Sequence, residues 1–210
     1  MSETTTATTT ASAVPTGNTY DKYASTNRLE QRMMSGFLAA LDSLLDGIEP
    51  LRILEIGVGE GVVMARVRER FPDATIIGVD LPDQSLAEEW RELGLSCLFG
   101  DATALPFPDD AFDLVMAIEV LEHVPNPDRA LRELARVCTG AVIASVPFEP
   151  VWRLGNMLRR RYLKAFGNTP GHVNHWTRWG FTRMIGKRFA VEKVRSPLPW
   201  TMVRARRAPK

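Results

Sequence analysis

A loop with a glycine at every second position most constrains what this chain can fold into. Gly57, Gly59 and Gly61 follow a short apolar run at residues 53–56, and an apolar pattern with helical spacing begins directly after them. The run is typical of a strand buried on both faces, and the spacing predicts a helix over residues 62–71. Glycine permits a positive φ and lets backbone approach a ligand, while the free N–H groups of a helix start favour polar or anionic groups. The sequence therefore predicts a ligand-binding turn.

An aspartate further along the chain indicates which ligand the turn binds. Asp80 ends a second apolar run, residues 75–79, and lies nineteen residues beyond Gly61. A carboxylate at the end of that strand can accept both hydroxyls of a ribose, which suggests a nucleoside cofactor. Dinucleotide sites carry a third glycine in G-x-G-x-x-G, and Val62 occupies its place here, so a dehydrogenase is a weak alternative.

Two stretches resemble a known enzyme family. Residues 54–61, Leu-Glu-Ile-Gly-Val-Gly-Glu-Gly, resemble motif I of the class I S-adenosylmethionine-dependent methyltransferases. Residues 100–124 run from Gly-Asp-Ala through Leu-Pro-Phe-Pro to Glu-Val-Leu-Glu-His-Val and resemble the middle of its small-molecule branch. The resemblance covers about residues 51–147.

The pattern of predicted elements defines the fold class. Strand-like and helix-like segments alternate, which predicts an α/β fold with a mostly parallel sheet and helices on both faces. The resemblance implies a Rossmann-like sheet of seven strands in the order 3-2-1-4-5-7-6. The expected strands are residues 53–56, 75–79, 95–99, 112–118, 141–146, 189–194 and 199–205, and the expected helices are residues 28–45, 62–71, 82–94, 126–137, 152–163 and 177–188.

We expect one domain over residues 20–210, preceded by a disordered tail. Residues 1–19 are mostly Thr, Ala and Ser with one charge, Glu3, and contain no apolar segment typical of a signal peptide. A cytoplasmic location is therefore expected. Residues 148–176 are expected to form a lid over the acceptor pocket. Their stretch 152–163 combines an apolar face with a dense positive face, so peripheral membrane contact is the second interpretation.

The net charge of +1 conceals an asymmetry between the parts of the chain. Residues 151–210 hold 15 Lys and Arg and a single acid, Glu192, which gives +14, and the remainder carries −13. A basic segment of this kind suits an acidic substrate, a phosphate or a membrane surface. Equally, the two parts can neutralise each other across the fold.

The resemblance also implies a set of cofactor-binding residues. The glycine loop, ordered by Glu55, would approach the methionine and ribose part of S-adenosylmethionine, with Asp80 on the ribose hydroxyls. Around the adenine, Leu81 would pack on the ring and Asp101 would accept from the amino group, although Asp101 could instead cap a turn. The full expected set is Tyr20, Tyr23, Glu55, Gly57, Gly59, Gly61, Asp80, Leu81, Asp101, Ala102, Ile118 and Glu119.

Three histidines are the candidate general bases. His123 follows the fourth strand and could act as a base or line the cofactor site, and His172 and His175 could be bases or purely structural. No metal site is expected, because neither Cys nor carboxylate stands at ligand spacing from His172 and His175. The two cysteines, Cys97 and Cys138, are expected to be reduced core thiols.

The predicted reaction is methyl transfer to a small-molecule acceptor that is hydrophobic and either lipid-linked or a secondary metabolite. O-methylation is placed slightly ahead of C- or N-methylation. A nucleic-acid methyltransferase is the alternative suggested by the basic segment, but the Asn/Asp-Pro-Pro-Tyr/Phe motif of many amino-directed DNA enzymes is absent after the fourth strand. A further alternative is a cofactor-binding fold that serves as a partner protein. Oligomeric state is left open.

Overall fold

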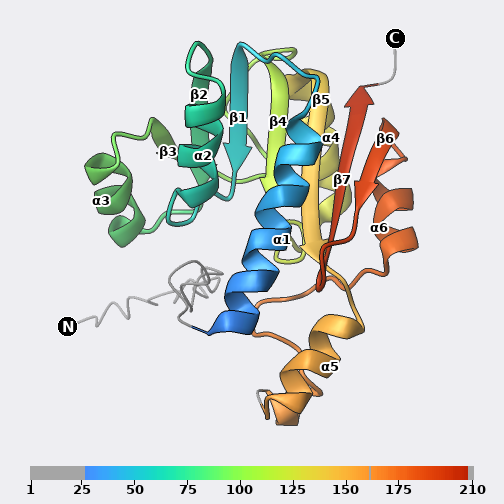
Figure 1. Ribbon diagram of the computed structural model, residues 1–210. Helices are drawn as coiled ribbons and strands as arrows, with labels where there is room; N and C mark the ends of the chain where they lie inside the picture. Colours follow the sequence, from blue (N-terminus) through green and yellow to red (C-terminus); the bar gives the residue numbers. More distant parts are fainter. Residues whose placement is uncertain (1–26, 161, 208–210) are drawn as a thin grey trace, which may run out of the picture.

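The computed structural model describes residues 27–160 and 162–207 and contains a seven-stranded sheet in the order β3-β2-β1-β4-β5-β7-β6 (Figure 1). The five strands β1 to β5 run parallel, and β7 runs antiparallel to both β5 and β6. The predicted strand order is therefore confirmed. The strands are Arg52–Ile56, Thr75–Asp80, Cys97–Phe99, Phe112–Ile118, Cys138–Pro147, Phe189–Arg195 and Trp200–Arg207, for β1 to β7 in turn. The predicted tail, Tyr20 and Tyr23 lie outside the described residues.

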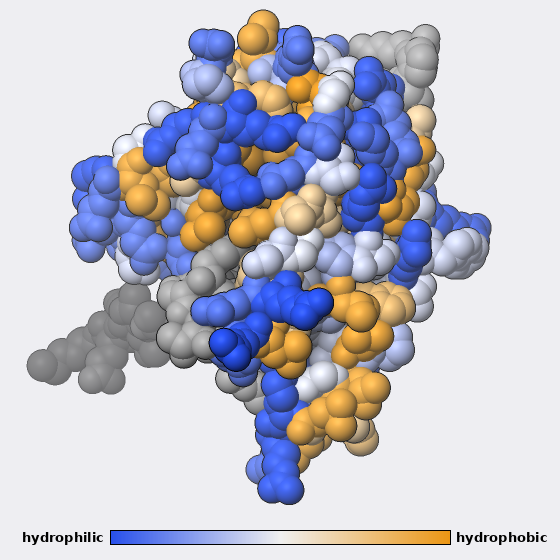
Figure 2. All heavy atoms as spheres, in the orientation of Figure 1, coloured by the Kyte–Doolittle hydropathy of each residue, from blue (hydrophilic) through white to orange (hydrophobic). Residues whose placement is uncertain are grey.

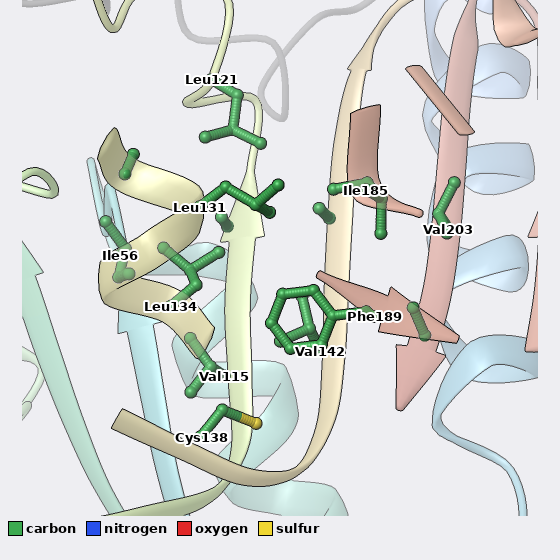
Figure 3. Packing of buried hydrophobic residues seen from close by; sticks show 14 of the residues in the cluster. Ile56, Val115, Leu121, Leu131, Leu134, Cys138, Val142, Ile185, Phe189 and Val203 are labelled. Carbon is green, nitrogen blue, oxygen red and sulfur yellow. The ribbon is translucent and has the colours of Figure 1, made fainter. Parts of the chain in front are cut away.

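Helices cover both faces of the sheet. The six helices α1 to α6 are Arg28–Leu45, Val62–Arg70, Gln84–Glu92, Pro127–Val137, Val151–Leu158 and Arg178–Ile185, with a 3-10 turn η1 at Leu163–Ala165. Buried side chains of α1, α2 and α3 share one hydrophobic cluster, and those of α4 and α6 share the other (Figure 3). Neighbouring strand residues such as Leu114 and Val115 belong to opposite clusters, because successive side chains point to opposite faces. This explains the continuous apolar runs.

The element boundaries differ from prediction in a few places. The strand β5 starts at Cys138 rather than residue 141, because its pairing with β4 extends back to Phe112. The helix expected over residues 152–163 ends at Leu158, and Arg160 and Tyr162 then adopt left-handed φ values of 55° and 52°. Leu29 is 64% exposed, so the first turn of α1 extends beyond the core.

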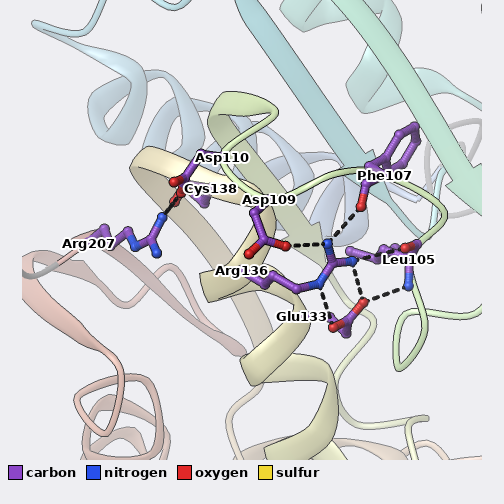
Figure 4. Close-up of polar contacts among 8 residues, drawn as sticks. All are labelled: Leu105, Phe107, Asp109, Asp110, Glu133, Arg136, Cys138 and Arg207. Carbon is purple, nitrogen blue, oxygen red and sulfur yellow. Dashed lines mark hydrogen bonds and ion pairs between the residues drawn. The ribbon is translucent and has the colours of Figure 1, made fainter. Parts of the chain in front are cut away.

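An arginine network fastens the loop after β3 to α4 (Figure 4). Arg136 donates to both carboxylate oxygens of Glu133, to Asp109, and to the carbonyls of Leu105 and Phe107. Glu133 also accepts from the backbone N–H of Leu105 at 2.9 Å. A loop that has little regular structure is thereby held by side chains of a helix that packs on the sheet.

This network predicts a pH dependence of stability. Hydrogen bonds from the Arg136 guanidinium hold the pKa of the Glu133 carboxyl below its usual 4.5. When folding lowers the pKa of an acid, the ionised acid stabilises the fold at any pH above its pKa in the unfolded chain. This stabilisation is lost as the pH falls through the lower pKa that the acid has in the folded protein. We expect Glu133→Gln to lower the free energy of unfolding at neutral pH, with the difference from wild type shrinking below pH 4.5 in urea denaturation. The exposed Glu88→Gln is the control, and a difference that stays constant with pH would contradict the assignment.

The basic part of the chain is partly neutralised by acids elsewhere in the fold. Among the described residues, ion pairs join it to earlier parts of the chain: Arg159 with Glu30, Lys187 with Asp128, and Arg207 with Asp110. Arg204 and Arg206 share Glu192, the acid within the basic part itself. The pairs with earlier residues favour the interpretation in which the two charged parts neutralise each other.

The two cysteines are free, which confirms the prediction of reduced thiols. Burial raises the pKa of the Cys97 thiol to about 12 and that of Cys138 to about 11. Among the described residues, none of the helices combines the length and the apolar character that crossing a bilayer requires.

Candidate active site

A cavity of about 550 Å³ opens at the carboxyl ends of β1, β2 and β4, where open parallel sheets carry their ligands. Most of the residues predicted from the sequence line it. Those present are Glu55, Gly57, Gly59, Asp80, Leu81, Asp101, Ala102, Ile118, Glu119 and His123. Gly61, His172 and His175 do not belong to the lining.

The glycine loop joins β1 to α2 through left-handed backbone. Gly57, Gly59 and Gly61 have φ values of 72°, 52° and 81°, which L side chains rarely adopt. A Cβ added at Gly57 would overlap the side chain of Val120. The N–H of Gly57 donates to the carbonyl of Val79 at 2.7 Å, and this hydrogen bond fixes the loop to β2. The alternating glycines are thus required by the backbone itself.

Asp80 connects the end of β2 to this loop. One carboxylate oxygen accepts from the N–H of Gly59 at 2.7 Å, and the other accepts from the N–H of Leu81 at 2.7 Å. Burial raises the pKa of Asp80, while these two hydrogen bonds oppose that shift. Because each carboxylate oxygen has two lone pairs, Asp80 can hold the loop and still accept from a ligand hydroxyl.

Glu55 lies beneath the loop and is only 1% exposed. Burial raises its pKa well above the usual value, and the nearby Asp80 carboxylate raises it further. Its Oε2 has no hydrogen-bond partner among the described residues. Burial thus disfavours the charged form of Glu55, whereas Asp80 keeps two hydrogen bonds that stabilise its carboxylate.

Asp101 caps a turn, the second of the two roles that the sequence left open, and also faces the cavity. Its Oδ1 accepts from the N–H of Thr103 at 2.7 Å and caps the turn after β3, and the residue also lines the cavity together with Ala102. Leu81 is 37% exposed beside them. The roles of these residues toward an adenine ring stay predictions.

Glu119 is held by two partners that its position in the sequence does not suggest. It has a left-handed φ of 59° directly after β4. One carboxylate oxygen accepts from the Ser145 hydroxyl at 3.0 Å, and the other accepts from the indole N–H of Trp200 at 2.7 Å. Trp200 also packs against Phe37, with ring centroids 5.0 Å apart. Glu119, Trp200 and Phe37 all line the cavity.

Sequence reasoning missed Trp200, Phe37 and Met34, which line the cavity from β7 and α1. None of them carries a motif, and an apolar residue at core spacing gives no local sign that it faces a ligand. Their placement follows from tertiary packing alone.

The three histidines occupy different places. His123 lines the cavity, and its Nδ1 lies 3.0 Å from the carbonyl of Gly171. His172 is buried behind it, with ring centroids 4.9 Å apart. His175 is exposed and pairs with Asn168 at 2.7 Å. The fold therefore brings His123 and His172 together and leaves His175 on the surface.

Fold and site together define the class of protein: an α/β protein with a Rossmann-like sheet and a cavity between a glycine loop and acids at successive strand ends, where open parallel sheets bind their ligands. The match to a family described as a methyltransferase domain covers residues 54–143, which contain the glycine loop, Asp80, Asp101 and Glu119.

Curated relatives agree with that match. The chain is 34% identical over 122 residues to a malonyl-[acyl-carrier protein] O-methyltransferase of Geobacter sulfurreducens, covering 56% of this chain and 44% of that protein. It is 36% identical over 107 residues to a demethylmenaquinone methyltransferase of Thermus thermophilus, covering 48% of this chain and 49% of that protein. The chain spans about half the length of these relatives.

Solved structures share the fold. A magnesium protoporphyrin IX methyltransferase from Synechocystis, solved with bound SAH, superposes with a TM-score of 0.64 over 88% of this chain and 89% of that one, at 17% identity. Residues 54–143 of this chain thus match a methyltransferase domain, the curated relatives that it resembles are methyltransferases, and the solved structure shares its fold.

Proposed function

We propose that this protein transfers the methyl group of S-adenosylmethionine to a hydrophobic small-molecule acceptor. The observation that carries the proposal is the cavity at the carboxyl edge of the sheet, which joins the left-handed glycine loop to Asp80, Asp101 and Glu119. In this proposal Asp80 accepts from the ribose hydroxyls and Asp101 from the adenine amino group. Ile118 and Glu119 line the methionine end, and Tyr20 or Tyr23 covers it.

The chemistry asks little of the protein beyond alignment. The methyl group is carried on a sulfonium, so an acceptor atom attacks in line, forms the new bond to carbon, and leaves a neutral thioether behind. The protein contributes proximity and orientation. A base is needed only where the acceptor must lose a proton, and of the three candidate histidines His123 is the one that lines the cavity.

The segment of residues 148–176 supports a hydrophobic acceptor. Figure 1 shows α5 beyond the carboxyl end of β5, apart from the sheet. Trp152 of α5 packs against Trp200 of the cavity wall, with ring centroids 5.9 Å apart, so the segment adjoins the cavity. We propose that it acts as the lid of the acceptor pocket.

The outer surface of this segment mixes apolar and basic side chains. Its exposed large apolar residues among those described are Leu154, Met157, Leu158, Tyr162, Leu163, Phe166 and Val173. Basic residues stand among them in the sequence, and Figure 2 shows hydrophobic and hydrophilic side chains next to each other on this projecting end. Such a surface suits contact with a membrane that holds a lipid-linked acceptor. O-methylation of that acceptor remains slightly ahead, in keeping with the acyl-carrier O-methyltransferase among the relatives.

Calorimetric titration tests the proposal. We expect S-adenosylmethionine and S-adenosylhomocysteine to bind and NADH not to bind, because Val62 replaces the third glycine of a dinucleotide loop. Methyl transfer from labelled cofactor to a panel of hydrophobic phenols, quinones and lipid-linked acceptors then identifies the acceptor class. Cofactor binding without transfer to any acceptor, in a chain that binds another protein, would instead support a partner protein. Salt-sensitive RNA binding would support a nucleic-acid acceptor.

A further inference from the structure

Behind the cavity wall, two segments far apart in sequence bring titratable side chains together. Glu122 and His123 follow β4, and His172 lies in the segment between η1 and α6. One ligand atom from each of these three residues lies within 4.8 Å of the others. A fourth group, the Glu149 carboxylate, stands 4.0 Å from Nδ1 of His172. The cluster thus holds two imidazoles and two carboxylates.

The cluster is buried to a degree that calls for a compensating partner. Glu122 is 1% exposed, Glu149 is 7% exposed and His172 is 8% exposed. Both carboxylate oxygens of Glu149 and Nδ1 of His172 have no hydrogen-bond partner within the described part of the chain. Burying an unpaired carboxylate costs several kcal/mol unless a proton, a hydrogen-bond donor or a cation compensates it. A cation bound by His172 would compensate the buried negative charge of Glu149 beside it.

The surrounding backbone holds the two segments in place. The N–H groups of Val173 and Asn174 both donate to the carbonyl of Glu122, at 2.9 and 3.0 Å. The Asn174 side chain donates to the carbonyls of Leu121 and Val124. The positions of the ligand candidates are therefore fixed by contacts that do not involve their own side chains.

One histidine is also oriented as a metal ligand would be. Nδ1 of His123 lies 3.0 Å from the carbonyl of Gly171. A carbonyl can only accept, so this nitrogen carries the proton and the lone pair is on Nε2. Metal-binding histidines commonly donate their second N–H to a backbone carbonyl or carboxylate in this way.

We propose that Glu122, His123 and His172 bind a divalent transition-metal cation of the zinc type, with Glu149 supporting His172. Two imidazoles favour such a cation over Mg²⁺ or Ca²⁺, which prefer sites made only of oxygen. The sequence predicts no metal site, because neither Cys nor carboxylate stands at ligand spacing from His172 and His175. The fold supplies the carboxylates from other elements.

The site adjoins the cavity, because His123 belongs to both. A cation there can bind an acceptor oxygen at the cavity wall. That consequence rests on the proposed methyl transfer, whereas binding of the cation does not.

To test the site, the full-length chain is first stripped of metal with a chelator. It is then titrated with Zn²⁺ alone in a calorimeter. We expect one zinc ion to bind each chain, and we expect Mg²⁺ to bind far more weakly. His172→Ala and Glu122→Gln are expected to weaken zinc binding at least about tenfold, and the conservative Glu149→Gln to weaken it by about 10- to 100-fold. His175→Ala, which removes an exposed histidine three positions away, should leave zinc affinity unchanged.

Binding of S-adenosylhomocysteine is measured on the same samples. Loss of zinc affinity in variants that still bind this nucleoside supports the site and shows that they are folded. Wild-type protein that binds the nucleoside but not Zn²⁺ would overturn the metal site and leave the proposed function standing. Equal losses in His175→Ala and Glu149→Gln would indicate surface binding and would also overturn it.

Discussion

Replacing Asp80 by alanine is expected to weaken binding of S-adenosylhomocysteine by about 1.5–3 kcal/mol, roughly a ten- to 150-fold rise in Kd. The range is that of hydrogen bonds to a charged group. The variant removes the carboxylate proposed to accept from the ribose and, with it, the hydrogen bond that holds the N–H of Gly59. Calorimetry at one pH and salt concentration measures the change.

Asp73→Ala is the matched control, because it removes the same charge from an exposed position just before β2. It should leave the Kd within error of the wild type. An unchanged Kd in Asp80→Ala would show that the carboxylate takes no part in cofactor binding, and the ribose assignment would then be wrong.

Leu41→Ala is expected to lower the free energy of unfolding by about 2–5 kcal/mol, the usual cost of truncating a fully buried leucine. Leu41 is 0% exposed on α1 and belongs to the cluster that this helix forms against the sheet with Phe37 and Met116. Truncation leaves a cavity that the close-packed interior fills only in part. Urea denaturation monitored by circular dichroism gives the value.

Leu29→Ala supplies the control on the same helix, since Leu29 is 64% exposed. Its effect should stay within about 0.5 kcal/mol of the wild type. Similar losses in both variants would mean that the first turn of α1 packs in solution as firmly as its middle, contrary to the structure.

Much of the fold could be predicted from the sequence, because the strands that form the centre of the sheet are apolar on both faces. A run such as residues 112–118 reads as a fully buried strand without any knowledge of its neighbours. The strand order came from family resemblance, since spacing alone does not select one parallel arrangement. The cavity then follows, because parallel strands present their carboxyl ends at one edge and bring Asp80, Asp101 and Glu119 together.

The parts that escaped prediction depend on contacts between distant segments. Trp200 reaches Glu119 across 81 residues of sequence, and Gly171 contacts His123 across 48. No local periodicity encodes such a pair. The helix end at Leu158 was missed for a related reason, because the left-handed residues Arg160 and Tyr162 are not of a type that signals a break.

The position of β7 has a consequence for how the protein matures on the ribosome. This strand, the last of those described, lies between β5 and β6, and its Trp200 completes the cavity wall. Until Trp200–Arg207 has emerged, β5 is an unpaired edge, and such edges invite pairing with other chains. During translation the emergence of this strand therefore covers the edge of β5 and adds Trp200 to the cavity wall in the same step.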